Sequence, residues 1–388
     1  MDKIQLGIIT LIKSAITQQA YELPDGFDIG EAYALVSKHH VYSMVYDGAV
    51  RCGIPQTHPT MQLLFQKYCR ALQINEGQMR ELKRIFSAFE ENQIDYMPLK
   101  GTIMKSYYPK PELRQMGDAD ILIRQEQYDR IAAIMEELGF EEKGETDQDY
   151  TWQSRFLYVE LHKNLMPVDA KELYSYFGNG WPLAQKEANS RYAMTTEDFF
   201  IFLMAHFAKH YRLSGIGCRH VVDLWIFREL GFIKNNTHIE QELDKLHLLE
   251  FYQNICKLIS CWFENEKMDD KTEFISNTIF DSGSWGTIER LTISEGVRNN
   301  RNNSQKIGKV IYVIRRVFPK FEHLCAECPI LQKAPWLTPV VWFLRLIKKL
   351  SHPNTSFANH KKNLSLLTKD NIDARRKALN YVGLDYYD

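Results

Sequence analysis

The sequence predicts an α+β protein in which a small mixed sheet is embedded in a largely helical chain. Two patterns support this prediction. Apolar residues recur at helical spacing through most of the chain, whereas residues 93–185 contain short stretches that alternate between apolar and polar positions, as strands do. With 388 residues, the chain is longer than one hydrophobic core usually supports, so we expect several packed units.

The first segment, residues 1–92, is predicted to be helical. Leu64, Tyr68 and Leu72 are spaced four residues apart and would lie on one face of a long amphipathic helix. The helices expected here cover residues 4–17, 29–38 and 61–91.

The periodicity changes in residues 93–185, which we predict to form the sheet domain. Asp118 and Asp120 open a strand that continues with alternating apolar residues, and Gly139 follows a stretch of helical period, where a helix commonly ends. Strands are expected at residues 95–99, 118–123, 140–143, 150–153 and 156–162, and helices at 101–107 and 128–138.

Helical periodicity returns beyond Pro182. Thr195 and Asp198 resemble a capping box, and Phe199, Phe202 and His206 then share a helical face. Further helices are expected at residues 219–229, 240–249, 253–263, 307–318, 339–350 and 372–381, the helices at 307–318 and 339–350 as core helices with one solvated face. We therefore divide this part into a helical domain, 186–300, and a C-terminal helical segment, 301–388.

Charge and cysteine content limit the possible partners and the compartment. The net charge is −1, but residues 301–388 carry 16 Lys and Arg against 6 Asp and Glu, so a basic C-terminal segment follows an acidic body. Nucleic acid is a possible partner for that segment, but no RNA-recognition motif favours it. The seven dispersed cysteines, the lack of a signal-peptide pattern and the lack of a membrane-spanning run indicate a cytoplasmic protein.

The residues that suggest chemistry are acids in predicted strands. Asp118 and Asp120 lie two positions apart, so their carboxylates project from one face of the strand. Glu160 is an acid among apolar neighbours in a later strand. Converging carboxylates repel one another unless cations neutralise them, and oxygen ligands of this kind suit Mg²⁺. The sequence therefore predicts a site for two Mg²⁺ ions, with Mn²⁺ as an alternative, held by Asp118, Asp120 and Glu160.

A second group of residues suggests phosphate binding. Lys100, Gly101 and Thr102 join a strand to a helix, where glycine allows a phosphate to approach the backbone and the helix start offers N–H donors. Lys100 and the Thr102 hydroxyl would add contacts, and Arg114 would reach the same phosphates as a fork-shaped donor. For Lys100 and Arg114 the alternative is a surface ion pair.

Together these residues resemble the DNA polymerase β-like nucleotidyltransferases, in which a glycine-led helix precedes an acid-x-acid strand and a third acid follows on a later strand. More narrowly, the motifs are similar to a large bacterial family described as uncharacterised nucleotidyltransferases. The motifs that carry the resemblance are Leu99-Lys100-Gly101, Tyr108-Pro109, Arg114, Asp118–Ile123 and Val159-Glu160-Leu161-His162, with extensions at residues 205–210 and 219–223.

The resemblance implies a polymerase β-like domain in which Asp118 and Asp120 bind metal and Glu160 is the third ligand or the general base. We accordingly predict a Mg²⁺-dependent enzyme that transfers a nucleoside monophosphate from an NTP, with ATP expected among the substrates, to a hydroxyl of an unidentified small-molecule or protein acceptor. The alternatives are an Asp-x-Asp metal-dependent glycosyltransferase and a non-catalytic nucleotide-binding scaffold.

Several histidines and cysteines have more than one interpretation. His162 shares the face of Glu160 and either orients it, contacts the nucleotide or is structural. His206 and His210 have the spacing of a zinc pair without the glutamate of the metalloprotease motif. We favour Lys209 and His210, with Arg219 and Asp223, as the far wall of a nucleotide cleft that residues 186–300 close. The isolated pair Cys325 and Cys328 is a weak zinc signal.

Overall fold

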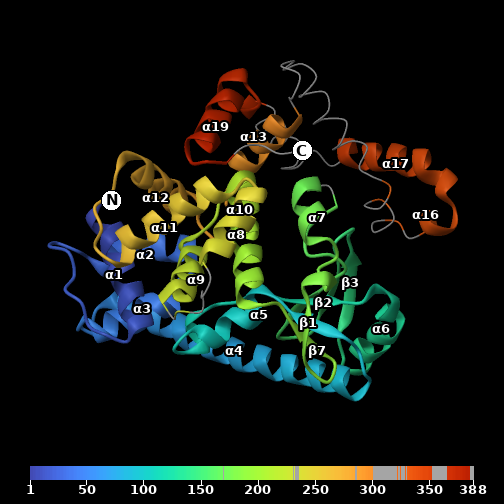
Figure 1. Cartoon of the computed structure of the whole chain (residues 1–388), viewed down its shortest axis with the longest axis horizontal. Helices are drawn as coiled ribbons and strands as arrows, with labels where there is room; N and C mark the ends of the chain where they lie inside the picture. Colours follow the sequence, from blue (N-terminus) through green and yellow to red (C-terminus); the bar gives the residue numbers. More distant parts are fainter. Residues whose placement is uncertain are drawn as a thin grey trace.

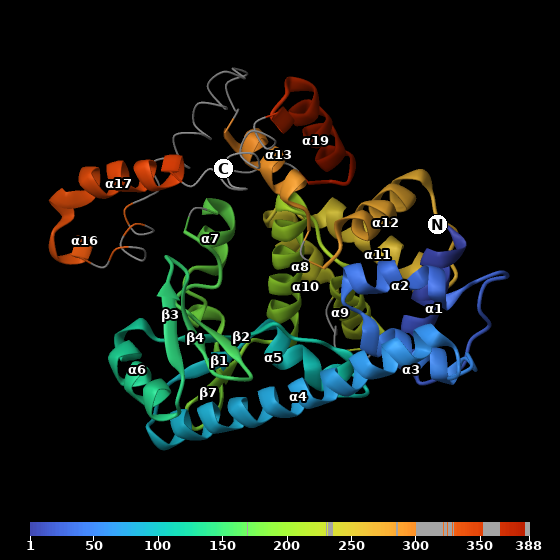
Figure 2. The ribbon, with the colours of Figure 1, turned by 180° about the vertical axis from the view of Figure 1, so that it is seen from behind.

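The computed structural model describes residues 1–168, 170–229, 231, 236–284, 286–299, 321, 324, 328, 330–351 and 365–384. A seven-stranded sheet lies at one end of the molecule and a group of helices at the other (Figure 1, Figure 2). The long helix α4 (Pro59–Glu91) runs along the base of both. The prediction of an α+β fold with a mixed sheet in a largely helical protein is confirmed.

The N-terminal helices form where their ends are capped. Asp2 and Gln5 make a reciprocal capping box at the start of α1 (Lys3–Thr17). Asp28 accepts two backbone N–H groups at the start of α2 (Ile29–His39). Helix α4 begins with a proline, which has no N–H to leave unpaired at the first helical position. The three helices predicted in this segment are therefore confirmed.

The sheet has the strand order β3-β4-β5-β2-β1-β7-β6. Its strands are β1 (Tyr96–Pro98), β2 (Asp118–Ile123), β3 (Glu141–Glu145), β4 (Asp149–Gln153), β5 (Tyr158–His162), β6 (Gln185–Ala188) and β7 (Arg191–Ala193). The pairs β2–β5 and β1–β7 are parallel and the other pairs are antiparallel, so the sheet is mixed. Helix α5 (Lys100–Met104) follows β1, and α6 (Tyr128–Glu137) follows β2.

One face of the sheet packs on helices α4 and α6. Ala119 and Ile121 of β2 are fully buried in a cluster with Ile85 and Phe89 of α4 and Ile131 of α6. Because side chains alternate along a strand, this packing leaves the other face of β2 to Asp118 and Asp120. The apolar core therefore fixes the direction in which the two aspartates point.

The prediction that helices return directly after Pro182 is wrong for residues 185–193. This stretch forms β6 and β7, and the Tyr96 N–H donates to the Ser190 carbonyl at 3.0 Å where β1 meets β7. The side chains of β6 are exposed, so no burial alternation marks the strand in the sequence. The sheet thus extends past residue 185, the predicted end of its domain.

The second half of the described chain is mainly helical. Its helices are α7 (Lys171–Phe177), α8 (Thr196–Leu213), α9 (Cys218–Glu229), α10 (Asn236–Lys245), α11 (Leu249–Phe263) and α12 (Asp270–Ser282). Thr195 caps α8 by accepting the Asp198 N–H. Ile8 and Ile12 of α1 lie in the same buried cluster as Phe207 of α8, so the N-terminal helices and the later helices share one core.

Some helices differ from the prediction. Helices α3 (Tyr42–Arg51), α7, α12 and α13 (Ile288–Asn299) were not predicted. The predicted helix 240–249 begins and ends too late: His247 has a φ of 52°, and α10 closes at Lys245 before α11 begins at Leu249.

The C-terminal part contributes α13, α16 (Ile330–Lys333), α17 (Thr338–Ser351) and α19 (Lys369–Tyr381). The predicted helix 307–318 lies outside the described residues. Helix α17 was expected to be a core helix with one solvated face. Val341 and Trp342 pack on a small cluster with Leu324 and Leu331, but Val340, Phe343 and Leu344 are exposed, so its apolar side chains are less buried than predicted. Among the helices described here, none has the length and apolar character to cross a bilayer.

Candidate active site

The candidate site lies on the sheet face opposite α4 and α6, where acids from neighbouring strands gather. In the parallel register of β2 and β5, Asp120 pairs with Glu160. In the antiparallel register of β4 and β5, Asp149 pairs with His162. Asp118 lies two residues before Asp120 on β2. All these residues line one cavity of about 460 Å³.

Asp120 is the centre of a hydrogen-bonded group. Its Oδ1 accepts a hydrogen bond from the Lys100 Nζ at 2.7 Å and lies 2.8 Å from the His162 Nε2. The same His162 nitrogen is 3.4 Å from the Glu160 Oε2. The structure therefore brings Asp120, Glu160, His162 and Lys100 together, with His162 between the two carboxylates.

The electrostatic environment differs between the two aspartates. Burial and the negative charges of Asp120 and Glu160 raise the pKa of Asp118. Burial alone would also raise the pKa of Asp120, but the Lys100 ammonium and His162 outweigh it and hold that pKa well below its ordinary value. Asp120 is therefore ionised in the metal-free protein, and Lys100 supplies the charge that balances it.

Lys100 and Gly101 form the turn from β1 into α5. Lys100 has a φ of 39°, a conformation unusual for a residue with a side chain, and its ammonium points back to β2. A Cβ on Gly101 would lie 2.8 Å from Arg114 Nη1, so glycine permits this close approach. Both residues line the cavity with the acids.

Arg114 and Thr102 were predicted to contact the phosphates, but the structure does not place their side chains for this role. Arg114 is buried and donates from Nε and Nη2 to the two oxygens of Asp223 on α9, at 2.8 and 2.9 Å. Its donor fork is thus already occupied, although the side chain lines the cavity. Thr102 lines a different cavity, with Leu99 and Ile103.

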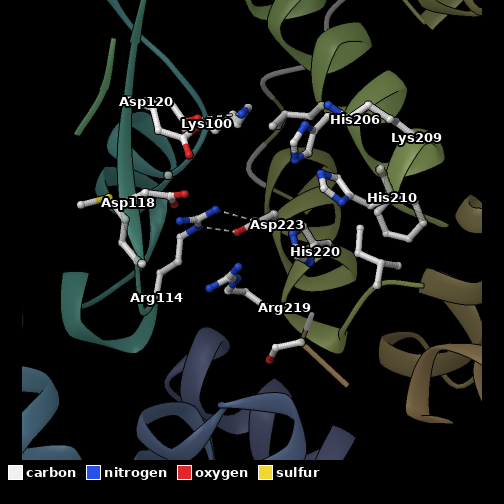
Figure 3. Close-up of a pocket in the computed structure, with 18 of the residues that line it drawn as sticks. Lys100, Arg114, Asp118, Asp120, His206, Lys209, His210, Arg219, His220 and Asp223 are labelled. Atoms are coloured by element: carbon white, nitrogen blue, oxygen red, sulfur yellow. Dashed lines mark hydrogen bonds and ion pairs between the residues drawn. The ribbon is translucent and has the colours of Figure 1, made fainter. Parts of the chain in front are cut away.

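Helices α8 and α9 form the wall that faces the acids (Figure 3). His206, Lys209 and His210 come from α8, and Arg219 and His220 from the start of α9. Burial, together with nearby positive charges, lowers the pKa of His206 and His220 and lowers that of His210 to about 3. This wall therefore presents neutral imidazoles with Lys209 and Arg219, at neutral pH.

Asp149 is a cavity residue that the sequence did not reveal. Burial is the main cause that raises the pKa of the Asp149 carboxyl, although the charge of His162 opposes this shift. Asp149 opens a short strand after a polar turn, and its relation to Glu160 depends on the register of β4 against β5. No periodicity in the sequence fixes that register.

Neither of the two candidate zinc sites, His206 with His210 and Cys325 with Cys328, is supported by the described structure. The rings of His206 and His210 lie 4.3 Å apart between centroids, but within the part of the chain that the structure describes no acid or cysteine joins them as a third ligand. Cys328 is a free thiol, and Cys325 lies outside the described residues.

The acid cluster fits a divalent cation. Ligand atoms of Asp120, Glu160 and His162 all lie within 4.8 Å of one another. Asp118 and Asp149 add carboxylates to the same cavity, and Lys100 is the cation that contacts the cluster directly. Oxygen-rich donor sets with this excess of negative charge suit Mg²⁺ or Mn²⁺.

Comparisons with known proteins identify the family. The model of the family described as "Uncharacterised nucleotidyltransferase" matches residues 25–264. A search of curated proteins found no match. Among solved structures, the chain is similar to the antibiotic-resistance factor ANT(2'')-Ia, with 14% identity and a TM-score of 0.35, over 46% of this chain and 98% of that one. The family match spans the strands of the acid cluster and the facing helices, and the chain is a member of the uncharacterised nucleotidyltransferase family.

Proposed function

We propose that the protein transfers a nucleoside monophosphate from an NTP to a hydroxyl group of an acceptor, in a reaction that depends on Mg²⁺. The observation that carries the proposal is the parallel register of β2 and β5, which sets Asp120 beside Glu160. Asp118 lines the same cavity, facing a wall that contains Lys209 and His210. Acids on one side and phosphate-binding groups on the other suit a metal–triphosphate substrate.

Asp118, Asp120 and Glu160 would hold the metal, as one ion or two. When bound, Mg²⁺ neutralises charge on the phosphates and favours ionisation of the attacking hydroxyl. His162 contacts both Asp120 and Glu160 and orients their carboxylates. Mn²⁺ would fit the same oxygen ligands.

The triphosphate would lie between the start of α5 and helix α8. Gly101 leaves room for a phosphate next to the backbone, and Lys100, Lys209 and His210 offer donors from both sides of the cavity. Arg114 and Thr102 are omitted from this group, because Asp223 occupies the Arg114 fork and Thr102 lines another cavity.

The transfer itself is an in-line exchange at the α-phosphorus. The acceptor oxygen forms a new O–P bond while the bond to the leaving pyrophosphate breaks, and the hydroxyl proton passes to solvent or to a base. The chain's residues contribute mainly by holding the reactants in line and by balancing charge.

The test is transfer of label from each of the four α-³²P-labelled NTPs into fractionated metabolites and protein, with pyrophosphate release measured in parallel. Asp118→Asn with Asp120→Asn should lower Mg²⁺-dependent release by about a thousandfold or more, because the metal ligands are lost. Asp147→Asn, at an exposed acid in the turn before β4, is the matched control and should retain full activity.

An active double variant with an intact fold would contradict the proposal. Tight NTP binding without turnover in every acceptor pool would instead indicate a nucleotide-binding scaffold. Cleavage of nucleotide sugars without pyrophosphate release would indicate the glycosyltransferase alternative.

A further inference from the structure

Two arginines line one part of the cavity, the buried Arg114 and the half-buried Arg219, and only Arg114 is paired with a carboxylate. Asp223 receives both of its ion-pair contacts from Arg114, and the Tyr108 hydroxyl also donates to its Oδ1 at 2.7 Å. Arg219 lies near this group and donates from Nη1 to the Gln115 carbonyl at 2.8 Å. No carboxylate lies within 4.0 Å of Arg219 in the described part of the chain, so its charge is not directly balanced.

Charges of both signs act on Arg219. Burial and the nearby Arg114 lower the pKa of Arg219, although the negative charges of Asp223 and Asp118 oppose this shift. The Nε of Arg219 is buried and has no hydrogen-bond partner in the described structure. The Nδ1 of the neighbouring His220 is also buried and also has no partner there. A buried charge and unpaired donors cost stability unless a ligand satisfies them. An arginine held in this way at a cavity wall is suited to bind an anion.

Arg219 lies away from Lys100 and Lys209, two of the groups that we assign to the triphosphate. Figure 3 shows Lys100 and Lys209 at one end of the cavity and Arg219 at the other, with Asp118 on the sheet side between them. The charge of Arg219 acts on Asp118, so the two ends are linked through the acid cluster. An anion at Arg219 would therefore lie in a different part of the cavity from Lys100 and Lys209.

We propose that Arg219, with His220, binds an anionic group, phosphate or carboxylate, of the acceptor substrate. The assignment to the acceptor rests on the proposed function. It names the acceptor's chemical class as a hydroxyl compound that also carries a negative charge. Repulsion from Lys209 and Arg219 on this wall would disfavour a polycationic acceptor.

The test uses inorganic phosphate as the probe and Arg219→Gln as the variant, because glutamine keeps a donor for the Gln115 carbonyl. Phosphate is titrated by calorimetry into metal-free protein and into protein saturated with Mg²⁺ and α,β-methylene ATP. Wild type should bind phosphate under both conditions, and Arg219→Gln should weaken that binding about tenfold or more. Arg80→Gln, at an exposed position of α4, is the matched control and should bind like wild type.

Stability in the absence of ligand separates binding from a structural contribution. Removing a half-buried charge that no carboxylate contacts directly should leave urea stability unchanged or raise it. A fall in stability of Arg219→Gln with phosphate binding retained would overturn the proposal. Loss of α,β-methylene ATP binding together with phosphate binding would assign the anion to the nucleotide and overturn the acceptor assignment. The metal-free titration reports on Arg219 even if no nucleotide transfer is found, so failure of the proposed function is a distinct result.

Discussion

Lys100 is the residue whose conformation and charge most directly affect the site. Its positive φ places the ammonium 2.7 Å from Asp120 Oδ1, where it neutralises a carboxylate that we assign to a metal. Backbone strain of this kind costs about 1 kcal/mol and persists where the surroundings require it. We infer that Lys100 competes with the cation for Asp120 until a nucleotide offers its phosphates to the ammonium.

Replacing Lys100 with methionine should separate these effects. In Lys100→Met, Mn²⁺ should bind the nucleotide-free protein roughly tenfold more tightly, because the competing charge is gone, while nucleotide transfer falls. Electron paramagnetic resonance of Mn²⁺ measures the affinity. Lys110→Met, which removes an ion pair with Asp47 at the N-terminal helices, is the control and should leave the affinity unchanged. Unchanged or weaker Mn²⁺ binding in Lys100→Met would contradict the inference.

At the scale of elements, α1 and α3 pack closely because of one glycine. A Cβ on Gly48 of α3 would lie 2.0 Å from the Leu11 carbonyl oxygen of α1, which is backbone and cannot rotate away. The side chains of Ile12 and Val45 are fully buried beside this contact. The contact packs the two N-terminal helices directly against each other.

Gly48→Ala should therefore lower the free energy of unfolding by roughly 1–3 kcal/mol, since the two helices must move apart. Urea denaturation measures the change. Gly144→Ala is the matched control, because a Cβ there meets nothing within 4 Å and the φ of Gly144 is not positive. Equal stabilities for the two variants would show that α1 and α3 separate without cost.

The sequence predicted the elements whose own pattern is strong. Strand β2 alternates Asp118 and Asp120 with buried apolar residues, and its predicted bounds match the structure. Helix α3 has no such pattern: it contains Gly48, has no side-chain cap, and is stabilised by its contact with α1. Packing between segments that are distant in the sequence leaves no pattern in the local sequence, so it could not be predicted.

The same distinction applies to the candidate site. The two-residue spacing of Asp118 and Asp120 showed that they share a face, and Glu160 stood out as an acid in an apolar strand. The pairing of Arg114 with Asp223 links positions 109 residues apart, and the contribution of Asp149 depends on strand register. Neither could be deduced from the spacing of residues, because both are set by tertiary contacts.

At the scale of the whole molecule, His39 joins three separate segments. Its Nδ1 accepts the Cys218 N–H at the start of α9, and its Nε2 donates to the Phe280 carbonyl on α12. This arrangement requires the neutral imidazole. Burial lowers the pKa of His39 from 6.5 to about 4, despite the hydrogen bond to Phe280.

Stability should therefore fall as the pH decreases through this interval. Below pH 6.5 the unfolded chain takes up a proton at His39, whereas the folded protein does not until about pH 4. The full loss from this residue is on the order of 3 kcal/mol. His206, His210 and His220, whose pKa values are also lowered, add to it.

Urea denaturation between pH 8 and pH 5 measures this dependence. His39→Gln should be less stable than wild type at pH 8, because it keeps at most one of the two hydrogen bonds. Its stability should also depend less on pH, by the equivalent of about one proton. A pH dependence identical to that of wild type would show that His39 is not held neutral by the fold.

Locating a bound metal would test directly whether the acids of β2 and β5 hold the catalytic cation. Crystals grown with Mn²⁺ and α,β-methylene ATP would be measured by anomalous diffraction. We expect Mn²⁺ in coordination contact with Asp118, Asp120 and Glu160, with the Lys100 ammonium displaced from Asp120 toward the phosphates. Mn²⁺ bound elsewhere, with Lys100 still paired to Asp120 and the nucleotide outside this cavity, would contradict this expectation.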